Sequence, residues 1–181
     1  MQPRIDIRVA DEAFVVATWG RLFIQIWRGI PTGKRSAKVN ELATSFAIAS
    51  SFPASSLFIV EHSSPSPDDE TRRNFATFSR DIVAKMAIAV IVSEGGGFRG
   101  ALVRAVGVTL TTILPHRSHF KFVNDVDAAA QLLKHHLAPG SGGAPAILQV
   151  VEEVRSKIGQ EIGDGPRTSL DLGGLPLSGK R

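Results

Sequence analysis

The stretch AIAVIVSEGGG (residues 87–97) decides the fold class of this chain. Residues 87–92 form an uninterrupted apolar run within a predicted strand 87–93. Three glycines then lead into residues 98–110, where apolar side chains recur at helical spacing. A fully apolar strand followed by a helix is typical of a parallel sheet whose two faces are both covered. The same order of strand and helix occurs earlier in the chain, where the strand 57–61, apolar up to its last residue Glu61, precedes another predicted helix.

That second helix has a clear start in Ser66-Pro67-Asp68-Asp69. The Ser66 hydroxyl suits an N-cap, proline suits the first turn, and the two carboxylates suit the positive end of the helix dipole. An apolar strand, a capped helix and another apolar strand therefore predict a βαβ unit.

The first thirty residues predict antiparallel strands. Residues 5–9 alternate apolar and charged side chains, and the runs 13–17 and 22–27 flank Gly20, which can adopt the positive φ of a tight hairpin. We expect three short strands joined as a meander at one side of the sheet.

The remaining segments complete a single α/β domain over residues 1–137. Apolar spacing predicts a helix ending at residue 49, a short strand at 120–123, and a helix from Asn124-Asp125 to about Leu137. The predicted fold is α/β, with a mixed, mostly parallel sheet, an N-terminal antiparallel hairpin and about four covering helices.

Three further segments follow in the prediction. Residues 138–146 have the Gly, Pro and Ser content of a linker, 147–162 form an amphipathic helix, and 163–181 form a disordered tail. The apolar stripe of that helix is predicted to dock on its own domain or on a second copy, which leaves a homodimer open.

Composition excludes several classes of function. With no cysteine among 181 residues, disulfides, thiol catalysis, Cys-ligated zinc and iron–sulfur clusters are ruled out. No apolar run approaches the roughly 18 residues of a membrane span, and residues 1–6 lack a signal-peptide pattern, so we expect a cytoplasmic protein. The net charge of +4 is mild and the basic residues are scattered, with no tyrosine for stacking, so the sequence does not favour nucleic acid.

Two glycine-containing loops resemble nucleotide motifs. Residues 95–100 (GGGFRG) satisfy G-x-G-x-x-G between a strand and a helix, with Asp125 as a candidate ribose ligand. The chain lacks the second mononucleotide-binding half, however, and Asp125 also suits a helix cap, so we prefer a tight turn. A small anion bound at Gly97, Phe98 and Arg99 is an intermediate interpretation, and a nucleotide- or dinucleotide-binding enzyme is the alternative function.

The second loop, GIPTGKRS (residues 29–36), is one residue short of a phosphate loop. Arg35 stands at the position where a phosphate loop needs the hydroxyl that binds the metal ion. We therefore prefer to interpret Thr32 as the N-cap of the following helix.

Other side chains also give no clear catalytic pattern. His62 lies beside Ser63 and Ser64, as in a hydrolase pair, but the sequence has no nucleophile elbow of the G-x-S-x-G type. We therefore predict no catalytic residue, cofactor or metal. Glu61 and Glu94 follow two parallel strands, at the edge where α/β sheets place ligands.

The order of segments resembles the STAS (SpoIIAA-like) domain family, in its divergent bacterial branch grouped with lipid-binding Sec-fourteen-like domains. The likeness covers about residues 11–137. It rests on the strand 23–31 with Trp27, the strand 57–61, the helix start Pro67-Asp68-Asp69-Glu70, and residues 90–99.

The resemblance implies a non-enzymatic regulatory switch that binds another protein, as anti-sigma factor antagonists do, with a regulatory kinase or sigma-pathway component as partner. Binding of a lipid or another small apolar ligand is a further alternative that the family implies. The family's phosphorylated serine motif, Asp-Ser-Ser-Gly, is missing here, so no phosphosite is carried over. The predicted partner- or anion-binding surface comprises Ser64, Ser66, Glu94, Gly97, Phe98 and Arg99.

Overall fold

The structure is a computed structural model, and it describes residues 3–65, 67–82, 85–94 and 119–160. Within these ranges the chain forms six strands, four α-helices and a short 3₁₀ helix at Lys134–His136. In chain order the strands and α-helices are β1 (Ile5–Ala10), β2 (Phe14–Trp19), β3 (Leu22–Trp27), α1 (Gly33–Ala49), β4 (Ser55–Val60), α2 (Asp69–Asp81), β5 (Ile88–Ser93), β6 (Phe120–Val123), α4 (Val126–Leu133) and α5 (Gly143–Arg155).

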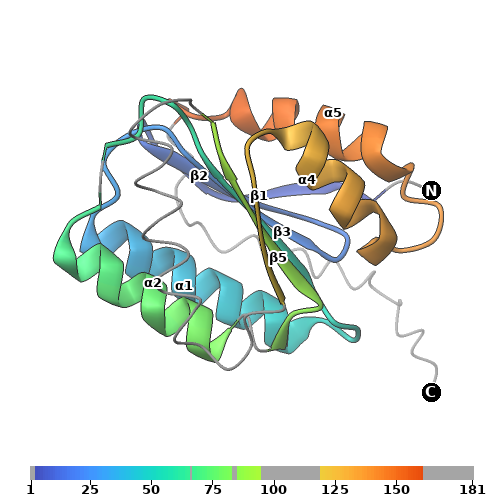
Figure 1. Cartoon of the computed structure of the whole chain (residues 1–181), viewed down its shortest axis with the longest axis horizontal. Helices are drawn as coiled ribbons and strands as arrows, with labels where there is room; N and C mark the ends of the chain where they lie inside the picture. The colour runs from blue at the N-terminus through green and yellow to red at the C-terminus, as the bar shows by residue number, and fades with distance from the viewer. Residues whose placement is uncertain (1–2, 66, 83–84, 95–118, 161–181) are drawn as a thin grey trace, which may run out of the picture.

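All six strands belong to one sheet whose spatial order equals the chain order, β1-β2-β3-β4-β5-β6 (Figure 1). The β1–β2 and β2–β3 pairs are antiparallel, and the pairs from β3 to β6 are parallel. The predicted fold class is therefore confirmed. So is the hairpin at Gly20, which has φ +55° in the turn between Trp19 and Leu22.

The strand order explains which helices cover which face. Right-handed connections between parallel strands that always step in the same direction place their helices on one face. Helices α1 and α2 do lie together on one face, whereas α4 and α5 cover the other (Figure 1). The core under α1 and α2 is rich in aromatic rings, such as the stacked pairs Phe14–Trp27 and Phe58–Phe75, each with centroids 4.8 Å apart.

Helix α5 is part of this core, and its bounds differ from the prediction. It begins at Gly143, four residues earlier than expected, and ends at Arg155. Ala144 and Ala146, which the sequence placed in a linker, are buried against the sheet because small side chains allow close packing there. The stripe residues Ile147, Val151 and Val154 are fully buried in the same cluster, so the stripe docks on its own sheet.

The start of α2 also corrects a prediction. Asp68, not Ser66, is the N-cap residue, and its Oδ1 accepts a hydrogen bond of 2.7 Å from the Thr71 N–H. The caps at Thr32 and Asp125 are confirmed, since each side chain accepts a hydrogen bond from a backbone N–H of the first turn. The helix predicted over residues 98–110 and the predicted tail lie outside the described residues. In the part of the chain that the structure describes, no helix has the length and apolar content to cross a bilayer.

Candidate functional site

Three neighbouring parallel strands end at one edge of the sheet, here called the carboxyl edge. Residues Arg28, Glu61 and Glu94 directly follow β3, β4 and β5. Backbone hydrogen bonds hold these residues in register, because the Glu61 N–H donates to Trp27 O and the Glu94 N–H donates to Val60 O, each at 2.9 Å. Open α/β sheets bind their ligands at the carboxyl ends of the strands, so this edge is the candidate functional site.

The carboxylates of Glu61 and Glu94 are joined by arginines into one ion-pair network. Arg28 donates to both oxygens of Glu61, at 2.6 and 3.1 Å. Arg155, at the end of α5, lies 3.1 Å from Glu61 and donates to Glu94 at 2.6 Å and to Glu152 at 2.9 Å. Hydrogen bonding to Glu61, opposed by partial burial, raises the pKa of Arg28. The network therefore ties α5 to the ends of β3, β4 and β5.

The loop between β3 and α1 is held from several directions. The N–H groups of Arg28 and Gly29 both donate to Ala13 O at 2.8 Å. On the other side, the hydroxyl of Ser63 donates to Arg28 O at 3.1 Å, and that of Ser64 donates to Gly29 O at 3.2 Å. Only glycine fits at position 29, because a Cβ there would lie 2.6 Å from that of Ala13.

This fixed loop presents one large apolar side chain, Ile30, which is 61% exposed. Its carbonyl accepts a hydrogen bond of 3.2 Å from Arg35, which also donates to Asp11 at 2.9 Å and contacts Glu12. These contacts fix the backbone around Ile30 while leaving its side chain in solvent. The Ile30 side chain is thus an exposed apolar group in a loop whose neighbouring side chains, such as Arg35 and Ser63, are polar.

The structure brings two of the predicted site residues to this edge and describes their roles. Glu94 is ion-paired with Arg155, and Ser64 is buried, with its hydroxyl bound to Gly29 O. The predicted residues Ser66, Gly97, Phe98 and Arg99 lie outside the described residues.

The sequence prediction missed Arg155 and Ile30. Nothing local marks Arg155, which lies 61 positions from Glu94. Ile30 carried a weak signal, as a large apolar residue between Gly29 and Pro31 in a loop.

The phosphate-loop interpretation of residues 29–36 meets a further physical obstacle. Thr32 caps α1 by accepting a hydrogen bond from the Arg35 N–H, as the sequence indicated. The Glu70 carboxylate lies directly against Gly33, in space that a Cβ on Gly33 would need. A negative charge of the chain itself therefore occupies the start of α1, where a bound phosphate would need to sit.

The histidines do not gather with other ligands in the described ranges. His62 is exposed in the loop after β4, and the His119 ring nitrogen lies 2.9 Å from Met86 O. Across residues 3–65, 67–82, 85–94 and 119–160, the structure has no group of three His, Asp or Glu side chains placed to hold a metal ion.

Comparison of the chain with models of protein families, with characterised proteins and with solved structures gave no match. The resemblance to STAS domains therefore stays a prediction from the sequence.

Proposed function

We propose that this chain is a cytoplasmic, non-enzymatic regulatory module whose protein partner docks on the carboxyl edge. The observation that carries the proposal is the loop at residues 28–32, which is hydrogen-bonded on both sides and exposes Ile30 at its tip. A loop that is already ordered loses little conformational entropy on binding. An aliphatic anchor inside a polar rim also has the make-up of an interface hot spot, in which a central side chain is shielded from water by its neighbours.

The charged groups of this edge fit a structural role better than a chemical one. Glu61 and Glu94 are both bound by arginine, and Asp11 is bound by Arg35 and by the N–H groups of a turn. A general base needs carboxylate oxygens that are free to accept a proton from the substrate, whereas arginines occupy the carboxylate oxygens here. The network instead keeps the loops of the edge in fixed positions relative to α5.

The partner class comes from the resemblance alone. A STAS-like module would bind a regulatory kinase or a sigma-pathway component.

Affinity capture from the source organism tests the proposal. The wild-type chain is compared with Ile30→Asp at the carboxyl edge and with Ile48→Asp, the same substitution at a side chain 71% exposed on α1. We expect a specific partner with the wild type and with Ile48→Asp, and its loss with Ile30→Asp. Equal recovery on all three proteins contradicts the proposal.

A thermal-shift measurement with dinucleotides tests the alternative enzyme function. A millimolar ligand of micromolar affinity would stabilise the fold by about 4 kcal/mol through mass action. Stabilisation of that size by a dinucleotide would favour the loop 95–100 as a nucleotide site over the interaction module.

A further inference from the structure

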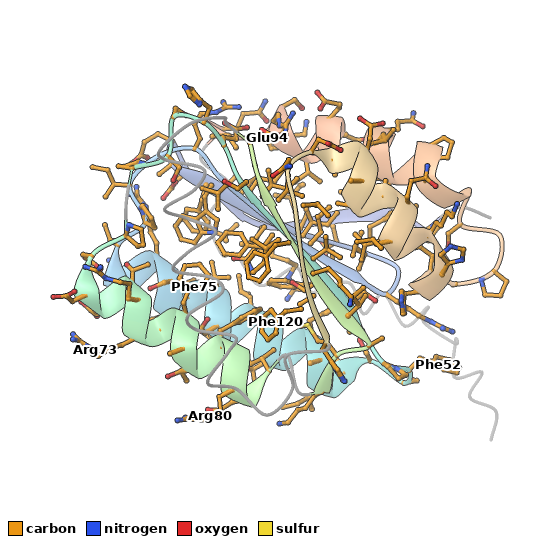
Figure 2. All side chains as sticks on the ribbon, in the orientation of Figure 1. Phe52, Arg73, Phe75, Arg80, Glu94 and Phe120 are labelled. Carbon is orange, nitrogen blue, oxygen red and sulfur yellow. The ribbon has the colours of Figure 1, made fainter. Side chains whose placement is uncertain are left out.

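The opposite end of the sheet, here called the amino edge, has a different surface. Arg21 and Lys85 precede β3 and β5, and Phe52 lies in the loop before β4. Backbone hydrogen bonds of 2.8 Å, from Ser55 N–H to Arg21 O and from Ala87 N–H to Ala54 O, hold these three segments side by side. In Figure 2, Phe52 lies at the end of the molecule opposite Glu94.

Two large apolar side chains are exposed at this edge. Phe52 is 57% exposed, and Ile48, in the last turn of α1, is 71% exposed. The Arg21 guanidinium lies 3.9 Å from the centroid of the Phe52 ring, so these two side chains form a cation–π pair at the amino edge.

Charge is distributed unevenly between the two ends. The described segments of the amino edge bring basic side chains together from separate parts of the chain, namely Arg4, Arg21, Lys85 and Lys134. The acidic side chains in or beside these described segments are Asp6 and Asp81. Arg8 lies 3.3 Å from Asp6, and Arg80 donates hydrogen bonds of 2.6 and 2.9 Å to Asp81. Acidic side chains are more numerous at the carboxyl edge, at positions that include Asp11, Glu12, Glu61, Asp68, Asp69 and Glu94, and Arg28, Arg35, Arg72 and Arg155 form ion pairs with five of these six.

We infer that the amino edge docks on the surface of a bilayer that contains anionic lipids. Basic side chains are attracted to anionic headgroups, and aromatic and aliphatic side chains insert at the boundary between headgroups and acyl chains. Phe52 and Ile48 would insert, while Arg21 and Lys85 would contact the headgroups. The carboxyl edge, with its paired charges, would then face away from the membrane, where the surface around Ile30 stays accessible.

A nucleic acid fits this surface less well. Single strands bind along a groove with several stacking rings, whereas Phe52 is the one large aromatic side chain exposed among the described residues, and its ring already contacts Arg21.

Co-sedimentation of the full chain with vesicles tests the inference. Vesicles of phosphatidylcholine are compared with vesicles in which about a third of the lipid is phosphatidylserine, at low and high salt. We expect at least tenfold stronger binding to the anionic vesicles and a loss of binding at high salt, because ionic screening weakens headgroup attraction. Equal binding to both vesicles, or no binding to either, overturns the inference.

Matched variants locate the contact. Phe52→Ser should weaken binding on the order of tenfold because its apolar surface no longer inserts. Lys85→Gln should weaken it about fivefold through loss of one charge. The controls Ile30→Ser and Lys34→Gln make the same kinds of change on exposed side chains at the carboxyl edge and should stay within about twofold of wild type. If the controls lose as much binding as Phe52→Ser and Lys85→Gln, the amino edge is not the contact.

Discussion

Replacing Glu61 with glutamine removes the charge that joins two arginines at the carboxyl edge. In the wild type this carboxylate accepts two hydrogen bonds from Arg28 and lies 3.1 Å from Arg155. Glutamine has nearly the same shape, so the substitution removes charge without opening a cavity. Each guanidinium then loses its shared counter-ion.

The expected loss of stability follows from the exposure of the three side chains. Glu61 is 11% exposed, whereas Arg28 and Arg155 are 42% and 23% exposed. Breaking a fully buried pair costs about 3–5 kcal/mol, and breaking a surface pair costs about 0–1 kcal/mol. A nearly buried carboxylate with partly solvated partners lies between these cases, so we expect the free energy of unfolding to fall by about 2 kcal/mol.

Urea unfolding measures this loss. With a slope of roughly 2 kcal/mol per molar urea, the midpoint should fall by about 1 M. Glu41→Gln is the matched control, because that carboxylate is 67% exposed and pairs with Lys38 at 3.3 Å, and it should change stability by less than about 0.5 kcal/mol. Equal midpoints for Glu61→Gln and Glu41→Gln would refute the structural role given to the network.

Three further substitutions test other parts of the account. Ile147→Ala should lower the free energy of unfolding by about 3 kcal/mol, since this side chain of α5 is fully buried against the sheet. Chemical denaturation should show a smaller loss for Leu148→Ala, whose side chain is partly buried, and equal small losses would mean that α5 is not part of the core. Gly29→Ala should cost about 1–3 kcal/mol because the new Cβ meets Ala13, and an unchanged melting temperature would contradict the close approach. Hydrogen bonding to the side chain and backbone of Thr71 lowers the pKa of Asp68, so its stabilising effect is complete above its usual pKa and is lost as the pH falls through the lowered value. Melting curves of Asp68→Ala and wild type should therefore differ at neutral pH and converge well below pH 4; a constant difference would argue against the ionised cap.

Much of the fold could be predicted because hydrophobic periodicity reports burial directly. The apolar runs that became β4 and β5 are buried strands, and the alternation over residues 5–9 became the edge strand β1. The predictions that were wrong concern helix ends. Ser66 and Asp68 both suit an N-cap, and local sequence does not decide which of them the chain uses. Around Ala144 and Ala146, small residues indicated a linker, whereas tertiary packing uses their small size against the sheet.

The site was less predictable because its contacts join distant parts of the chain. Glu61 and Glu94 could be placed at the carboxyl edge from strand order alone. Their partner Arg155 arrives only because α5 crosses the second face of the sheet and ends at that edge. Likewise, the exposure of Ile30 depends on how hydrogen bonds from Ser63 and Ser64 fix the loop, which no local pattern encodes.

Hydrogen–deuterium exchange of the full chain with its captured partner tests the docking surface most directly. We expect slower exchange on binding in residues 28–32, which carry the exposed side chain of Ile30, and in residues 61–64, whose serines hydrogen-bond to that loop, with exchange around Phe52 unchanged. Protection confined to the Phe52 end, or absent from both loops, would show that the partner binds elsewhere.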